Sequence, residues 1–126
     1  MKKPVVELSK RFRFEAAHQL LNVPETHKCG HLHGHSYTVE VAVRGAVKSE
    51  QGWLLDYGDL SRIVKPLVAQ LDHQNLNDVE GLPFTTAEHL CVWFWNQMKP
   101  QLPPLYRISI AETTTTQCDY YGETDD

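Results

Sequence analysis

Histidine is concentrated in one short segment of the chain, and metal chemistry is expected there. Four of the seven histidines lie in THKCGHLHGH, residues 26–35. His33 and His35 are two positions apart in a segment with strand-like alternation, and residues i and i+2 of a strand point to the same side. Both imidazoles can therefore reach one ion. Two other histidines are predicted to face the solvent, His27 and His89.

His18 is the predicted third ligand. It continues the apolar face of an alternating segment made of Val6, Leu8, Phe12, Phe14 and Ala16. A polar group on such a face needs a partner. If this strand pairs antiparallel with the one starting at His33, its end lies beside His33 and His35. Three neutral imidazoles with an open fourth position describe a catalytic zinc site. His31 has the same parity as His33 and is a rival ligand, although we expect it in a loop beside Gly30.

Cys29 is a candidate base or nucleophile. It lies four residues before His33, in a glycine-flanked loop and next to Lys28. A thiol near a cation and a metal suits either role. The spacing equally allows a fourth zinc ligand or an ordinary free thiol. Cys91 falls in an apolar helical pattern and is interpreted as a packing residue, and no feature assigns a role to Cys118.

Two acidic groups complete the candidates. Asp72 adjoins His73 at a predicted helix end, where a carboxylate can orient an imidazole and raise its basicity. The alternative is a polar helix terminus, where histidine is favoured by the helix dipole. Glu112 continues the face of Ile108 and Ile110, so a carboxylate occupies an apolar position. Such a group usually has a function or a partner; the alternative is a satisfied core acid or a strand-edge charge.

The candidates are positioned by segments whose hydrophobicity alternates with period two, which predicts half-buried strands. These segments cover residues 5–20, 35–44 and 106–112. Residues 53–55 are predicted to form a short return strand, and residues 113–116 are prone to β structure.

Two helices are predicted between the second and the last strands. The first begins at an N-cap, Asp56 or Asp59, and Pro66 is expected to kink or break it. Its apolar stripe is Leu60, Ile63, Val64, Leu67 and Leu71. The second starts at a capping box in residues 85–88 and runs to about Lys99. The order predicts an α+β fold, ββααββ, with a four-stranded antiparallel sheet covered on one face by two helices.

Length and composition indicate one globular domain over residues 1–126, with a frayed acidic tail at 123–126. The formal charge is −4 without a basic cluster, which disfavours nucleic acid. No apolar run suits a signal peptide or a membrane span, so we expect a cytoplasmic protein without a membrane partner. Three cysteines without CxxC spacing predict free thiols in a reducing compartment.

Four motifs together resemble the 6-pyruvoyl-tetrahydropterin synthase family. They are FEAAH at 14–18, CGHLHGH at 29–35, LDH at 71–73 with LND at 76–78, and ET at 112–113. The gap between Cys29 and His33 is similar to that of the 6-carboxy-tetrahydropterin branch. The family's PTxE motif is TTAE here, at residues 85–88, and it retains Thr86 and Glu88.

The resemblance implies the tunnelling fold, in which subunits join their sheets into a barrel. It implies a homo-oligomer, a hexamer built as a dimer of trimers, with sites between subunits. It also implies a Zn²⁺ lyase that converts the small molecule 7,8-dihydroneopterin triphosphate to 6-carboxy-5,6,7,8-tetrahydropterin, acetaldehyde and triphosphate in queuosine (7-deazaguanine) biosynthesis. The alternative is 6-pyruvoyl-tetrahydropterin synthase activity on the same substrate.

The resemblance also assigns roles to residues. The zinc ligands match His18, His33 and His35. Cys29 matches the proton-abstracting base, and Asp72 and His73 match its relay partners. Glu112 matches the acid that binds the pterin amino and ring N–H groups. Further substrate contacts are expected from Thr113, Thr86 and Lys28.

Two other classes of protein compete with the lyase. One is a non-catalytic zinc protein or metal store, which would be indifferent to the loss of Cys29 unless this residue is a ligand. The other is a zinc hydrolase, which the sequence disfavours because it has no HExxH-type helix.

Overall fold

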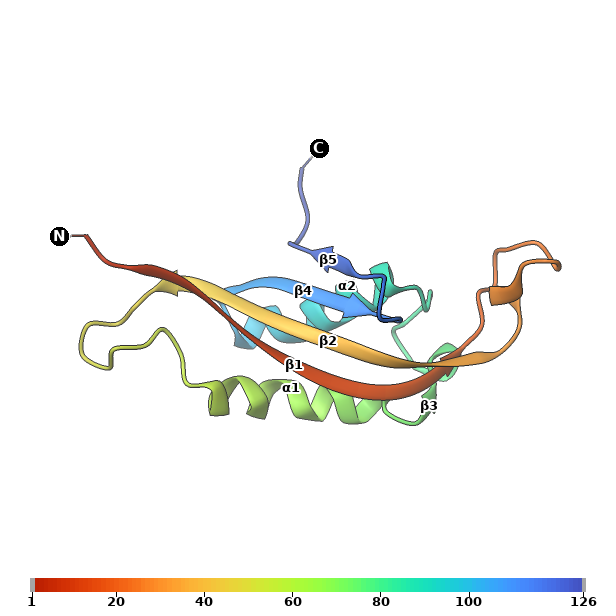
Figure 1. Cartoon of the computed structure of the whole chain (residues 1–126), viewed down its shortest axis with the longest axis horizontal. Helices are drawn as coiled ribbons and strands as arrows, with labels where there is room; N and C mark the ends of the chain where they lie inside the picture. Colours follow the sequence, from red (N-terminus) through yellow and green to blue (C-terminus); the bar gives the residue numbers. More distant parts are fainter. Residues whose placement is uncertain (1, 126) are drawn as a thin grey trace.

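The computed structural model describes residues 2–125 and has two long strands, two helices and several short elements (Figure 1). The strands and helices are β1 Val5–His18, β2 His33–Ala46, α1 Tyr57–Leu71, β3 Gln74–Asn75, α2 Ala87–Met98, β4 Leu105–Ala111 and β5 Cys118–Tyr120. Single 3-10 helical turns lie at Lys28–Gly30, Leu76–Asp78 and Lys99–Gln101.

The hairpin of β1 and β2 is the frame of the fold. The two strands pair antiparallel from Val5 opposite Ala46 to His18 opposite His33. The alternation of β1 puts Phe12 and Phe14 on the face that is buried by the helices. The predicted antiparallel pairing of these strands is therefore confirmed, and it brings the histidine segments to one end of the sheet.

Both helices pack on that same face and share one hydrophobic core with the strands. The fully buried core residues include Tyr37, Val39, Val41, Val64, Leu71, Leu90, Phe94, Ile108 and Ile110. Asp56 is the N-cap of α1 and its side chain accepts a hydrogen bond from Gly58 N at 2.9 Å. Pro66 does not break α1, which is continuous across it. Pro66 is exposed, so water can satisfy the carbonyl that lacks an N–H donor.

The sheet has five strands in the order β3-β1-β2-β4-β5, so the prediction of four antiparallel strands is wrong. The added strand β3 lies between the helices in sequence and pairs parallel with β1 at Ala16 and Ala17. Only two polar residues form it, and neither period nor composition marks them.

Two short segments predicted to be extended are not strands. Residues 53–55 form a bend after a turn in which Gly52 has a φ of +77°. Residues 113–116 also lie in a bend. The Thr113 hydroxyl is hydrogen-bonded to Thr116 Oγ1 at 2.6 Å and accepts a hydrogen bond from Thr115 N at 3.3 Å, which stabilises the bend. The last strand is instead β5, which pairs with β4.

The start of α2 differs by one residue from the predicted capping box. Thr86, not Thr85, is the N-cap, and its hydroxyl accepts from His89 N at 3.3 Å. No helix within residues 2–125 has the length and apolar content needed to span a membrane. Residues 123–125 of the predicted frayed tail have no regular secondary structure, and Asp126 lies outside the described residues.

Candidate functional site

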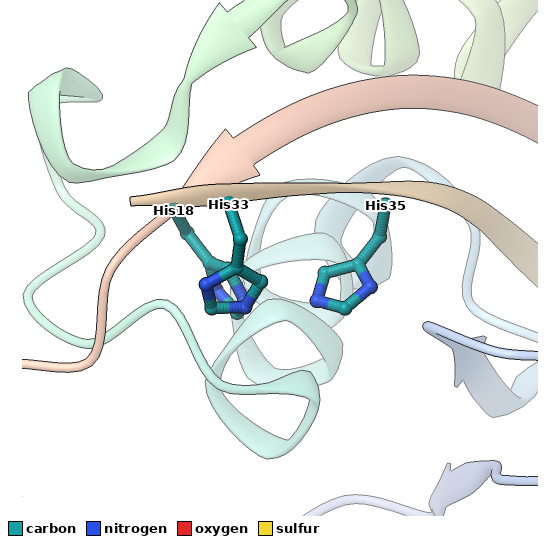
Figure 2. A group of neighbouring side chains, drawn as sticks. All are labelled: His18, His33 and His35. Atoms are coloured by element: carbon teal, nitrogen blue, oxygen red, sulfur yellow. The ribbon is translucent and has the colours of Figure 1, made fainter. Parts of the chain in front are cut away.

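Three histidines converge at the end of the β1–β2 hairpin. His18 and His33 are opposite each other in the register, and His35 is opposite Ala16. Figure 2 shows the three imidazoles projecting from the same side of the two strands. One nitrogen of each lies within 4.8 Å of the others. His18 is 2% exposed, and the other two are half-buried. The predicted clustering of His18, His33 and His35 is therefore observed.

Hydrogen bonds to Nδ1 leave the Nε2 atoms of His18 and His33 available for a metal. His18 Nδ1 lies 2.8 Å from the Thr85 carbonyl oxygen, and His33 Nδ1 lies 2.7 Å from that of His31. A carbonyl only accepts, so each Nδ1 must carry the proton, and the Nε2 lone pair of the neutral ring is free. The Nε2 of His35 is buried and has no hydrogen-bond partner among residues 2–125. All three rings can therefore offer Nε2 to an ion.

This donor set fits zinc. The protonation state of His18 also suits a metal, because burial lowers its pKa. The hydrogen bond to Thr85 and the charge of Glu112 raise this pKa, but their effects are smaller. A lowered pKa favours the neutral imidazole, which is the form that coordinates. Three imidazole nitrogens with a free position match catalytic zinc sites. His31, the rival ligand, contributes its backbone carbonyl to this arrangement, and its exposed side chain is not part of the cluster.

Glu112 points toward the histidines. It is the first residue after β4, and its Oε2 lies 3.7 Å from His35 Nε2. Its side chain is 25% exposed. The carboxylate that sequence parity placed on an apolar face therefore has a partner, and that partner is a candidate metal ligand.

The Tyr37 ring packs against the rings of His18 and His35. This residue was not assigned to the site from the sequence. Its ring stacks on Phe14 with centroids 4.9 Å apart, and its centroid is 5.4 Å from that of His35. Tyr37 is fully buried, and its hydroxyl has no hydrogen-bond partner in the described part of the chain. Burial raises the pKa of Tyr37, with a smaller contribution from the Glu112 charge. The available signal was parity, because His33, His35 and Tyr37 share one face of β2.

Cys29 lies in the loop that links β1 to β2 and extends beyond the end of the sheet (Figure 1). The Cys29 N–H donates to His27 Nδ1 at 3.0 Å, and the Cys29 carbonyl accepts from Leu20 N at 2.8 Å. His27 is exposed as predicted and caps this turn. His89 was predicted to face the solvent, but it is half-buried against the Phe84 ring, with centroids 4.8 Å apart.

Asp72 and His73 are held by β1. Asp72 Oδ1 accepts from Glu15 N at 2.9 Å and lies 3.1 Å from His73 Nδ1. His73 N donates to Glu15 O at 2.6 Å, and His73 has a φ of +60°, which is costly for a residue other than glycine. The hydrogen bond from the Glu15 N–H makes the largest contribution to lowering the pKa of Asp72, and the hydrogen bond with His73 lowers it further. The anchoring role of Glu15 had no signal in the sequence, since its contacts are made by the backbone.

Within residues 2–125, the Asp72–His73 pair makes no direct polar contact with the thiol or with the three histidines. His73 lines an open groove together with His35, Glu15, Ser36, Gln74 and Asn75, and its side chain is 77% exposed.

The predicted substrate contacts lie in different surroundings. The Thr86 hydroxyl is engaged as the α2 cap, and Thr113 contacts Thr116 in an exposed bend. Lys28 is exposed in the Cys29 turn. A separate groove beside Glu112 is lined by Ala87, Glu88, Ile110, Thr116, Gln117 and Cys118. Cys91 is fully buried, in line with its predicted packing role.

Comparisons with known proteins agree with this architecture. A family model described as 6-pyruvoyl tetrahydropterin synthase matches residues 7–123. The chain is 38% identical to the 6-pyruvoyl tetrahydrobiopterin synthase of Dictyostelium discoideum, covering 94% of this chain and 97% of that protein. It is 36% identical to the 6-carboxy-5,6,7,8-tetrahydropterin synthase of Synechocystis sp., covering 90% and 91%. The solved Caenorhabditis elegans 6-pyruvoyl tetrahydropterin synthase has a TM-score of 0.89 at 27% identity, covering 98% of this chain and all of that one.

Proposed function

The chain belongs to the 6-pyruvoyl tetrahydropterin synthase family, and from this premise we propose that it is a zinc-dependent lyase of the 6-carboxytetrahydropterin synthase type. It converts 7,8-dihydroneopterin triphosphate and one molecule of water to 6-carboxy-5,6,7,8-tetrahydropterin, acetaldehyde and triphosphate. Queuosine biosynthesis in the cytoplasm is the proposed setting.

The observation that carries this proposal is the orientation of three imidazoles toward one point, each with Nε2 available. His18, His33 and His35 would hold the zinc ion. Bound there, zinc supplies Lewis-acid polarisation of the side-chain hydroxyls of the substrate and so acidifies the adjacent C–H.

The residues of the chain supply the remaining chemistry. Cys29 takes the proton from the substrate side chain, and the Asp72–His73 pair passes it on. The Asp72 carboxylate favours the Nδ1–H form of His73, which leaves Nε2 as the proton acceptor. Glu112 accepts hydrogen bonds from the pterin amino and ring N–H groups, a charge-assisted two-point contact. Lys28, Thr86 and Thr113 contribute further substrate contacts.

We propose that the complete site lies between two copies of the chain. Within residues 2–125, the Asp72–His73 pair has no hydrogen bond to Cys29. This supports the proposal, because a relay must be within hydrogen-bond reach of the base it serves. The exposed His73 side chain is available to a second copy. A hexamer arranged as a dimer of trimers, with the sheets joined into a barrel, would pair the dyad of one copy with the thiol of another.

The 6-carboxy product is favoured over the 6-pyruvoyl product by the three-residue gap between Cys29 and His33. The 6-pyruvoyl activity is kept as a second candidate, because the Dictyostelium relative carries that name at a similar identity.

The test is anaerobic incubation of zinc-loaded protein with 7,8-dihydroneopterin triphosphate, followed by mass spectrometry. Acetaldehyde with 6-carboxy-5,6,7,8-tetrahydropterin is the expected result. A 6-pyruvoyl product would assign the chain to the second candidate function. A fully zinc-loaded protein that consumes no substrate would refute the lyase.

Cys29→Ala is the matched variant in this assay. The lyase requires that it keep zinc and lose turnover. If the turnover of Cys29→Ala equals that of the wild type, the Cys29 thiol has no role in the mechanism.

A further inference from the structure

Glu112 occupies a position that its proposed role in pterin binding does not explain. Within residues 2–125 its one ion-pair contact is with His35, and Oε2 lies 3.7 Å from the Nε2 that can bind a metal. A pterin that places its side chain on the metal extends its ring, and the N–H groups at the far ring edge, away from it. A carboxylate next to the metal ligand cannot bind that edge at the same time.

The distance suits a shared coordination shell. Zinc bonds of about 2.0–2.2 Å to nitrogen and oxygen, arranged tetrahedrally, place neighbouring ligand atoms about 3.3 Å apart. The observed 3.7 Å between Glu112 Oε2 and His35 Nε2 differs from this by a few tenths of an ångström. The three imidazole nitrogens, which lie within 4.8 Å of one another, must draw together in the same way around an ion.

The Glu112 charge is directed into the cluster rather than toward solvent. Its Oε2 lies 3.7 Å from His35 Nε2, and its side chain is only 25% exposed. Glu112 directly follows β4, so rotation about its side-chain bonds can move the carboxylate between the metal and the neighbouring groove.

We propose that Glu112 is the fourth metal ligand of the substrate-free enzyme and that substrate displaces it from the metal to the pterin ring. This inference rests on the zinc site of the proposed function. The carboxylate fills the position that a water molecule would otherwise take. The resting site would therefore have no water as its fourth ligand.

Cobalt substitution tests this without relying on catalysis. Co²⁺ alone is bound to the wild-type protein and to Glu112→Ala, with one ion per chain verified by elemental analysis, and visible spectra are recorded from pH 6 to 9. In Glu112→Ala a water takes the fourth position, and metal-bound water ionises near pH 7 in favourable sites. We expect a pH-dependent spectrum for Glu112→Ala and a pH-independent one for the wild type.

Glu88→Ala is the matched control, because Glu88 is a second carboxylate in the groove that Glu112 lines. Its cobalt spectrum is expected to equal that of the wild type and to stay independent of pH. Addition of neopterin, an unreactive pterin, to the wild-type cobalt protein should change the spectrum as Glu112 leaves the metal. A wild-type spectrum that titrates like that of Glu112→Ala overturns the proposal.

The outcomes separate this inference from the proposed function. A titrating wild-type spectrum in a protein that still converts 7,8-dihydroneopterin triphosphate refutes Glu112 ligation and leaves the lyase intact. A pH-independent wild-type spectrum in a protein without turnover keeps the ligation and refutes the lyase. Failure of the wild-type protein to bind cobalt stoichiometrically refutes the metal site on which both depend.

Discussion

Removing the Tyr37 hydroxyl is expected to stabilise the protein. The side chain is fully buried next to the histidine cluster, and its oxygen has no hydrogen-bond partner within the residues that the structure describes. In the unfolded chain the same hydroxyl is hydrated, so folding removes this hydration without replacing it. Tyr37→Phe keeps the ring and its stacking on Phe14, whose plane lies at 9° to it.

The size of the effect follows from the cost of an unsatisfied buried polar group, about 1–3 kcal/mol. We take the lower end, about 1 kcal/mol, as the expected gain in unfolding free energy. The chain has 126 residues, and an unfolding entropy of about 2.1 cal/mol/K per residue gives about 0.26 kcal/mol/K in total. The melting temperature of the metal-free protein should therefore rise by about 4 °C.

Urea denaturation and thermal melts of metal-free Tyr37→Phe and wild type measure this difference. Tyr106→Phe is the control, because the Tyr106 hydroxyl accepts from Arg44 Nη1 at 3.5 Å and its loss should bring no gain. A Tyr37→Phe protein that is less stable than wild type by 1 kcal/mol or more would refute the reasoning. That outcome would mean that the hydroxyl is satisfied in solution, by an internal water molecule.

Three further predictions concern the site and the core. His33→Ala should lower zinc affinity by on the order of 100-fold or more. His31→Ala should keep stoichiometric zinc, because His31 contributes its backbone carbonyl and not its side chain. Zinc content is measured by elemental analysis, and loss of zinc in both variants would contradict this prediction. Phe94→Ala removes a fully buried ring and should cost about 3–5 kcal/mol in urea denaturation, so a loss below 1 kcal/mol would be inconsistent with this core. Asp72 has a pKa below its unfolded value of 3.8, so its stabilising effect is present above pH 3.8 and is lost as the pH falls through the folded pKa. The melting-temperature deficit of Asp72→Asn should accordingly shrink below about pH 4, and a deficit that is constant from pH 7 to 2 would contradict the pairing.

The histidine cluster could be predicted from the sequence because it depends on local patterns. Period-two alternation defined β1 and β2, and a long hairpin brings the end of one strand to the start of the next. His18, His33 and His35 therefore met once the register was antiparallel. The apolar stripe and Asp56 located α1 for the same reason, since helical spacing and an N-cap are properties of neighbouring residues.

Contacts between distant segments decided the rest. The strand β3 exists because Gln74 and Asn75 pair with the backbone of β1, and two polar residues carry no pattern of their own. The N-cap of α2 lies at Thr86, while the buried Thr85 turns its carbonyl to His18, a partner 67 residues away. No property of Thr85 itself marks that contact.

The sequence alone thus determined which side chains are available for metal and acid–base chemistry, because residue type and strand parity are local. Only the tertiary structure decided that His18 offers Nε2, that Glu112 faces His35, and that Asp72 and His73 are held at Glu15. The contacts of His18 and Asp72 depend on backbone groups of remote segments, and the contact of Glu112 with His35 depends on the pairing of β4 with β2. Every residue type carries such groups, so their placement leaves no trace in the order of the amino acids.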